Sequence, residues 1–234
     1  MGKHVLVGAV AALLVVASCS DAKTTSAINR TTTTTTDANV GPRLQLGGGQ
    51  QVHWHAAVGL NICGEWQPGP VWPTSSSATP RGRAEDPSVY AGLHTHELAD
   101  GTSDGIVHME PLVREDAGNN ATFGRFLQYG GWSLSDNEVA LWDGTDRRAI
   151  KFAIKSRDCD GSPSKLRWAL KSGRDPSAAL VEQTGDINKY KMYDNDVIAI
   201  YVVAADADLK SFGDIPSEVN LHGDALSPSD FATS

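Results

Sequence analysis

Apolar and polar side chains alternate from Val52 to Ile62, and this pattern constrains the fold more than any other stretch of the chain. Because alternate side chains of a strand point to opposite faces, the pattern predicts a strand that is buried on one side. His53 and His55 lie on the polar face, so the strand presents two imidazoles on one surface. The apolar face consists of Trp54, Ala56, Val58, Leu60 and Ile62.

Further short segments have strand character. Leu93–His96 and Ile106–Met109 are separated by the turn-forming pairs Asp100-Gly101 and Asp104-Gly105. In the second of these segments His108 and Glu110 share a face. Three later segments are rich in β-branched and aromatic residues: Ile150–Ile154, Leu166–Leu170 and Val197–Val203, the last after a tight turn at Asp194–Asp196.

Helical signals are few. Thr122 can cap a short helix in which Phe123, Phe126 and Leu127 form one apolar stripe. Ser135–Glu138 fits a capping box and predicts a second brief helix that carries Val139 and Leu141. The sequence therefore predicts an α+β, mainly β fold, with antiparallel strands and one or two short helices in a single domain after a disordered linker.

The N-terminus has the features of an export signal. An apolar run from Val5 to Ala17 follows a short positive start and is too short to span a bilayer comfortably. The run leads into Val16-Ala17-Ser18-Cys19, which resembles the bacterial lipobox. This resemblance implies a lipoprotein signal peptide at residues 1–18 and a lipid on Cys19, which would anchor the protein to the cell membrane outside the cytoplasm. The alternative is an ordinary secretory signal and a secreted protein.

Composition divides the rest of the chain. Residues 19–50 are rich in Thr, Ser and Ala, and we expect them to be a disordered linker because they bury too little to offset their ordering entropy. Residues 51–223 are long enough for one domain with a core, and residues 224–234 are expected to be a flexible tail. The formal net charge of −8 argues against a nucleic-acid partner.

The cysteines fit an oxidising compartment. If Cys19 carries lipid, Cys63 and Cys159 remain as an even pair, and a disulfide between them is the preferred interpretation. The alternative is that Cys63 binds a metal ion while Cys159 is free.

Histidines form the candidate site. Five of the seven lie between residues 53 and 108, and two strands of His-x-His would bring ring nitrogens together as copper or zinc requires. Glu97 and Glu110 are further ligands or acceptors that orient an imidazole. A structural or pH-sensitive cluster without metal is the alternative. The candidate metal ligands are His53, His55, His94, His96 and His108.

Signals for other chemistry are absent from the sequence. It contains no Gly-x-Ser-x-Gly elbow, phosphate loop or dinucleotide fingerprint. Asp158–Gly161 and Asp194–Asp196 contain fragments of calcium loops, but neither continues to a distal glutamate, so both predict turns.

Three blocks resemble an uncharacterised family of secreted or membrane-anchored actinobacterial proteins. They are His53–Gly64, His94–His96 together with Asp104–Pro111, and Tyr193–Ile200. The match runs through most of the domain, although Glu97–Ala99 lengthens a loop that is usually shorter. The family has no established activity. The resemblance therefore implies a location outside the cytoplasm and a shared set of histidine blocks, but no reaction.

These features predict a lipid-anchored, extracytoplasmic protein with a histidine-rich copper or zinc site and no enzymatic activity. One alternative is a metal-dependent, hydrolase-like enzyme in which three histidines hold the ion and Glu97 or Glu110 is the general base. The other is a structural or adhesive surface module without metal.

Overall fold

The computed structural model describes residues 41–44, 53–73, 81–98, 100–142, 149–175 and 177–222. The predicted signal peptide, Cys19 and the C-terminal tail lie outside these residues. Residues 41–44, which the sequence assigns to the linker, lie against the domain, where the Gly118 amide donates to the Pro42 carbonyl at 2.8 Å. In the described part of the chain, none of the helices has the length and apolar character needed to cross a membrane.

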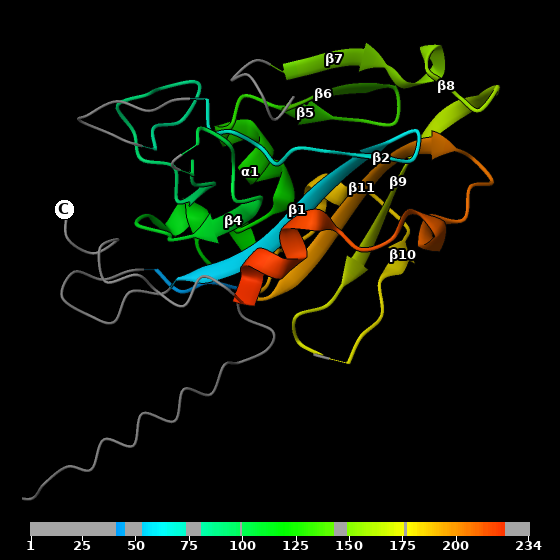
Figure 1. Cartoon of the computed structure of the whole chain (residues 1–234). Coiled ribbons are helices and arrows are strands. Elements are labelled where there is room, and N and C mark those ends of the chain that lie inside the picture. The colour runs from blue at the N-terminus through cyan, green and yellow to red at the C-terminus, as the bar shows by residue number, and fades with distance from the viewer. Residues whose placement is uncertain are drawn as a thin grey trace, which may run out of the picture. The chain divides into compact units, whose positions relative to one another are not determined.

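The main sheet has eight strands. Its order is β10-β9-β11-β1-β4-β3, with β2 beside β1 and β8 beside β9 (Figure 1). β1 and β11 are parallel, whereas the other pairs are antiparallel. The strands are β1 (Trp54–Ile62), β2 (Glu65–Gln67), β3 (Leu93–His94), β4 (Ile106–Met109), β8 (Asp158–Cys159), β9 (Ser162–Lys171), β10 (Val181–Gln183) and β11 (Asp196–Ala204). The prediction of a mainly β, largely antiparallel fold is confirmed.

Among the described residues, a second sheet, one α-helix and several 3-10 helices complete the regular structure. The sheet has the order β5-β6-β7, with β5 at Ser133–Leu134, β6 at Glu138–Trp142 and β7 at Ala149–Ala153. The helix α1 spans Phe123–Tyr129, and the Thr122 side chain accepts a hydrogen bond from the Arg125 amide, which confirms the predicted cap. Short 3-10 helices lie at Arg114–Asp116, Gly118–Asn120, Ile154–Ser156, Ile187–Lys189, Leu209–Phe212 and Pro216–His222.

The second predicted helix is wrong. Ser135 Oγ accepts from the Glu138 amide at 3.1 Å, as in a capping box, but the chain then enters strand β6. Val139 pairs with Phe152 and Leu141 pairs with Ile150 of β7, and both Val139 and Leu141 are completely buried. A serine hydroxyl that accepts a hydrogen bond from the amide three residues later occurs in tight turns as well as at helix N-termini. The pairing of β6 with β7 therefore decides whether a strand or a helix follows.

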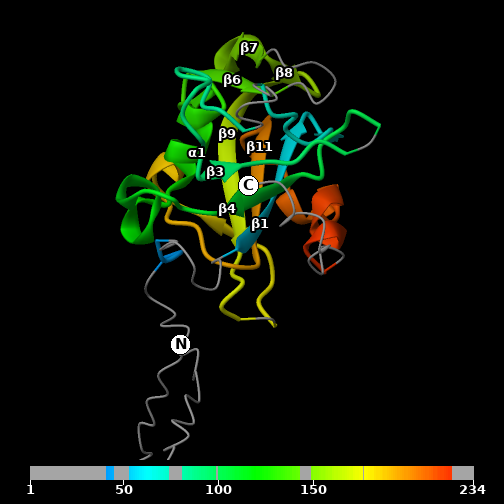
Figure 2. The same cartoon turned by 90° about the vertical axis from the view of Figure 1, so that its left-hand side faces the viewer.

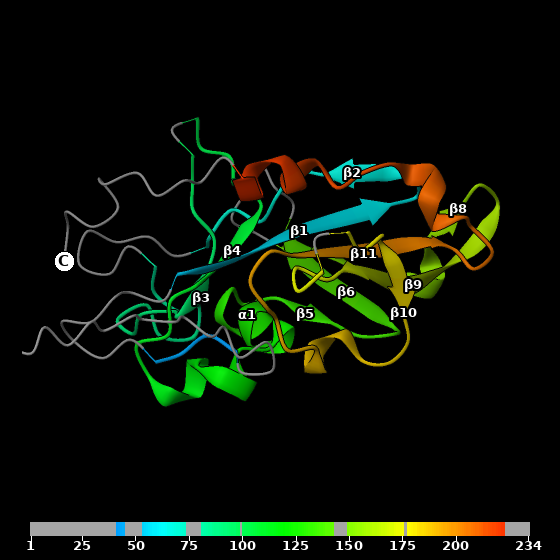
Figure 3. The ribbon, with the colours of Figure 1, turned by 90° about the horizontal axis from the view of Figure 1, so that it is seen from below.

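The main sheet is covered on both faces. On one face, α1 and the β5–β7 sheet pack over the even-numbered residues of β1, as in Ala56, Val58 and Leu60. On the other face, Leu209–Phe212 and Pro216–His222 pack near Ala57 and Ile106 (Figure 3). Because side chains alternate, His53 and His55 lie on the second face, as does His108 in β4. Figure 2 shows β3 and β4 beside the start of β1.

A disulfide joins the far end of β1 to β8. Cys63 and Cys159 are bonded, with their Cα atoms 4.9 Å apart and a sequence separation of 96 residues. The preferred interpretation of the cysteines is confirmed, and metal ligation by Cys63 is wrong because its sulfur is already bonded.

Candidate metal centre

Strand pairing places three histidines in one row. His94 in β3 lies opposite His108 in β4, and His108 lies opposite His55 in β1. Residues directly opposite each other on neighbouring strands point to the same face, so the three imidazoles share one surface. β1 and β3 are not neighbours; β4 lies between them, and His108 connects the two His-x-His segments.

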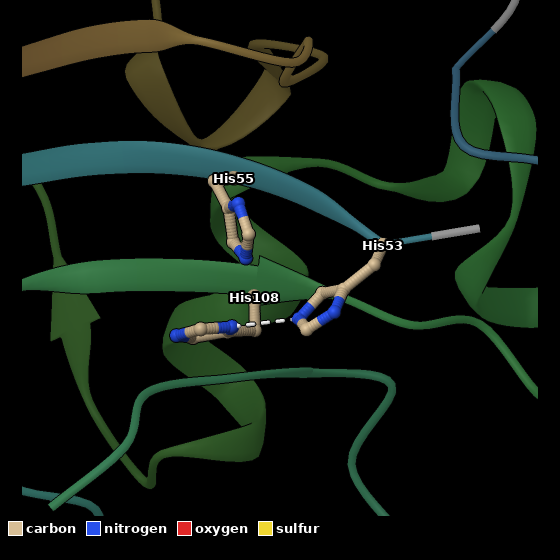
Figure 4. Close-up of side chains that lie close together, drawn as sticks. All are labelled: His53, His55 and His108. Atoms are coloured by element: carbon tan, nitrogen blue, oxygen red, sulfur yellow. Dashed lines mark hydrogen bonds between the residues drawn. The ribbon is translucent and has the colours of Figure 1, made fainter. Parts of the chain in front are cut away.

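His53 and His96 extend this row. The Nε2 atom of His53 lies 2.9 Å from Nδ1 of His108 (Figure 4). The His96 ring stacks on the His108 ring with 3.7 Å between the ring centroids, and its Nε2 lies 3.2 Å from Nε2 of His94. The His55 ring meets the His108 ring edge-on at 4.7 Å. All five candidate histidines therefore belong to one cluster, named here the histidine cluster.

The loop before β11 holds the backbone of His55. The His55 amide donates to Asp194 Oδ1 at 2.9 Å, and the Asn195 amide donates to the His55 carbonyl at 2.7 Å. Asn195 has a φ of 62°, a left-handed conformation that asparagine tolerates in a tight turn. The predicted turn at residues 194–196 is confirmed, and it fixes the strand end that carries His53 and His55.

Hydrogen bonds at the outer ring nitrogens orient two of the imidazoles. Nδ1 of His94 lies 2.7 Å from the Ala91 carbonyl, which can only accept, so Nε2 of His94 presents a lone pair toward His96. Nε2 of His108 lies 2.9 Å from Asp104 Oδ2 and donates to that carboxylate when it is ionised. Nδ1 of His108 then presents a lone pair toward His53. Histidines that bind metals are commonly fixed in this way.

Glu110 supplies a carboxylate inside the histidine cluster. Its Oε1 lies 2.8 Å from Nε2 of His53, and its Oε2 accepts a hydrogen bond of 2.6 Å from the Tyr90 hydroxyl. Glu97, the other glutamate suggested by the sequence, is exposed to solvent. Met109 is fully buried in the core on the opposite face of β4. Of Glu110, Glu97 and Met109, only Glu110 lies where it can bind a metal ion together with the histidines.

Burial keeps three of the imidazoles, those of His94, His96 and His108, neutral. It lowers the pKa of His94 to about 3 and that of His96 to about 2, and the neighbouring positive charges act in the same direction. Burial also holds the pKa of His108 well below its ordinary value. A neutral imidazole has the lone pair that a metal ion needs, so at neutral pH these rings are in the form that binds metal.

The two carboxyl groups respond in opposite directions. Burial raises the pKa of Asp104 to about 6 despite the hydrogen bond from the Ile106 amide. Burial also acts to raise the pKa of Glu110, but the hydrogen bonds from His53 and Tyr90, together with the neighbouring imidazoles, outweigh it and hold that pKa below its ordinary value. Glu110 is therefore a carboxylate throughout the neutral range.

Ligand atoms in the histidine cluster are close enough for a metal ion. Three groups have all their ligand atoms within 4.8 Å of one another. Two nitrogens on a tetrahedral zinc ion at about 2.0–2.1 Å are about 3.3 Å apart, so small side-chain movements suffice. The groups are His53 with His55 and His108; His94 with His96 and Glu110; and His96 with Asp104 and His108.

Two residues of this centre were not predicted from the sequence. Asp104 was interpreted only as part of a turn, although it lies four residues before His108. Tyr90 follows a proline-rich loop and has no local pattern that marks it. Comparisons with protein families, curated proteins and solved structures give no match, so the proposed function rests on the residues of the histidine cluster.

Proposed function

We propose that this protein is a lipid-anchored, extracytoplasmic protein that binds copper or zinc in the histidine cluster and carries out no reaction on the ion. The observation that carries the proposal is the position of His108. It lies 2.9 Å from His53 and stacks on His96, so it joins two His-x-His segments that lie at the start of β1 and the end of β3. Five imidazoles and a carboxylate thereby face one small volume.

The donor types support copper or zinc. Imidazole suits both ions, whereas magnesium and calcium prefer sites built from oxygen. A hydrogen-bonded histidine cluster without metal explains the same contacts less well. In that case Nε2 of His53 would have to donate one proton to both His108 and Glu110. A cation removes this conflict, since every group involved offers it a lone pair.

Burial supports binding rather than turnover. His94 and His108 are 0% and 1% exposed. An ion can enter past the more accessible His53 and Glu110 side chains, which are 11% and 17% exposed, but a substrate needs room beside the metal. The proposed role is therefore capture or delivery of the ion at the cell surface.

The test measures metal content. The full chain, purified in mild detergent, is stripped with chelator, exposed to copper or zinc, desalted and assayed by mass spectrometry for bound metal. Bound metal that is lost in the double variant His94→Ala/His96→Ala, and kept in the control His222→Ala, which removes a histidine that is not among the five candidate ligands, supports the proposal. A wild-type chain that takes up neither ion would overturn it.

The anchor has a separate test. The apolar run that ends at Cys19 supports lipidation, and residues 19–50 would then hold the domain away from the membrane. In a bacterial host that processes lipoproteins, the wild type should fractionate with membranes and carry a lipid-modified N-terminal cysteine by mass spectrometry. Cys19→Ala should lose the lipid, and an unmodified wild-type chain would contradict the proposed anchor.

A further inference from the structure

Two of the three donor groups have no residue in common. His53, His55 and His108 form the first group, which combines imidazoles of β1 and β4 with that of His53, the residue just before β1. The second group is His94, His96 and Glu110, which combines two imidazoles with a carboxylate. Both groups can therefore be occupied at the same time.

The third group competes with an existing hydrogen bond. It requires Asp104 and His108 to bind the same ion. Nε2 of His108 already lies 2.9 Å from Asp104, and this contact turns Nδ1 toward His53. The first two groups keep this arrangement, whereas an ion between Asp104 and Nε2 of His108 would displace its proton.

Glu110 lies between the first two groups. It is a donor of the second group, yet its Oε1 is 2.8 Å from Nε2 of His53 in the first. The groups are also in direct contact through the stacked rings of His96 and His108. Sites with two metal ions about 3.5–4 Å apart are a recurrent arrangement in proteins, and a carboxylate at this position can bind both ions.

We infer that the histidine cluster holds two metal ions, one bound by His53, His55 and His108 and the other by His94, His96 and Glu110, with the Glu110 carboxylate bridging them. This inference rests on the proposed function and deepens it. The ion of the second group then has three protein ligands, one fewer than a closed structural zinc site, whereas the bridging Glu110 gives the ion of the first group four. The second ion therefore keeps an exchangeable position, which suits a protein that passes metal on.

Stoichiometry tests the inference. The full chain in mild detergent is titrated with Cu(II) and, separately, with Zn(II), and bound ions are counted by native mass spectrometry. The expected wild-type value is two ions per chain. His53→Gln should lose one ion from the first group and His96→Gln one from the second, while His222→Gln should keep both.

Magnetic coupling tests the bridge. Two Cu(II) ions bridged by a carboxylate should give a weakened or half-field electron paramagnetic resonance signal, and each single variant should give the signal of an isolated ion. Glu110→Gln should reduce the coupling, whereas the exposed control Glu97→Gln should leave it unchanged. Circular dichroism confirms that each variant is folded.

The possible failures are distinguishable. A wild type that saturates at one ion overturns the two-metal inference and leaves the proposed function standing. Two ions without magnetic coupling would contradict the bridging role of Glu110. No bound ion at all overturns the proposed function itself. The wild-type count decides the main question even if a variant does not fold.

Discussion

Asp104 Oδ2 lies 2.9 Å from Nε2 of His108, whose other ring nitrogen lies 2.9 Å from His53. Asp104 is held in turn by the Ile106 amide, which donates to Oδ1 at 2.9 Å. The carboxylate thus fixes the ring nitrogen that carries the proton and directs the other into the histidine cluster. His108 joins the two His-x-His segments, so its orientation decides whether they act together.

Asp104→Asn should weaken metal binding. The amide keeps the shape of the carboxylate but loses its charge, so the proton position on His108 is less firmly fixed. Replacing such an outer partner costs about 10-fold to 100-fold in metal affinity. Competition with a chelator of known affinity measures this change for zinc.

A matched control for this substitution lies four residues away. Asp100 also precedes a glycine and also accepts from an amide two residues later, that of Thr102, but it is exposed. Asp100→Asn should leave zinc affinity unchanged. Equal affinities for the Asp104→Asn variant and the wild type would show that the contact with Asp104 does not orient a ligand.

Tyr90→Phe should weaken the ion bound through Glu110. The Tyr90 hydroxyl donates to Oε2 of Glu110 at 2.6 Å and holds the carboxylate in place, while the ring packs against His94. Phenylalanine keeps the ring and removes only the hydroxyl. We expect a loss of about 10-fold in affinity for the more weakly bound zinc ion, measured by calorimetric titration.

Tyr193→Phe provides the comparison for this change, since Tyr193 lies in the turn before β11 and outside the donor groups. It should bind zinc as the wild type does. A Tyr90→Phe variant with wild-type affinity for every bound ion would indicate that Glu110 keeps its position without the hydroxyl.

Local periodicity predicted the elements that carry the site. The alternation in residues 52–62 and the short segment 106–109 correspond to β1 and β4, and the alternation placed His53 and His55 on the face away from the main core. Strand order was not predictable, because pairing depends on contacts between distant segments. The position of β4 between β1 and β3 gives His108 its central place, and no pattern around His108 specifies this.

Other features depend on tertiary structure in the same way. The local sequence at Ser135 is compatible with both a helix N-terminus and a turn. The pairing of β6 with β7 determines that a strand follows. The sequence around Asp104 indicates only a turn. Its contact with His108 depends on the fold, because the turn brings the carboxylate within hydrogen-bond distance of that ring. Cys63 and Cys159 were paired by counting, which needed no knowledge of the fold.

The metal-free protein should lose stability when acidified. The pKa of His94 is lowered to about 3 and that of His96 to about 2 from 6.5, and the pKa of His108 lies well below 6.5. Below pH 6.5 the unfolded chain therefore binds more protons than the folded chain, so stability falls as the pH falls. The raised pKa of Asp104 has the opposite effect on stability between pH 3.8 and about pH 6, but this single carboxyl group is outweighed by the three histidines.

Thermal unfolding in the presence of chelator checks this dependence. The Tm should fall by at least about 4 °C between pH 7.5 and pH 5.5, since about 1 kcal/mol corresponds to about 2–4 °C for a domain of this size. His94→Gln/His96→Gln should show a shallower dependence because two of the buried imidazoles are gone. A Tm that stays constant over this range would contradict the depressed pKa values.

The disulfide should stabilise the fold without affecting metal binding. Cys63 and Cys159 are 96 residues apart, and closing a loop of this length corresponds to about 4–5 kcal/mol in the chain-entropy account. The bond lies at the end of β1 opposite His55, so its removal should leave the histidine cluster in place. Urea unfolding of Cys63→Ser/Cys159→Ser should show a free energy of unfolding about 4 kcal/mol lower, with unchanged zinc content in the absence of urea. Loss of zinc from the folded double variant would mean that the far end of β1 positions the histidines, and an unchanged free energy would mean that the loop is already constrained in the unfolded chain.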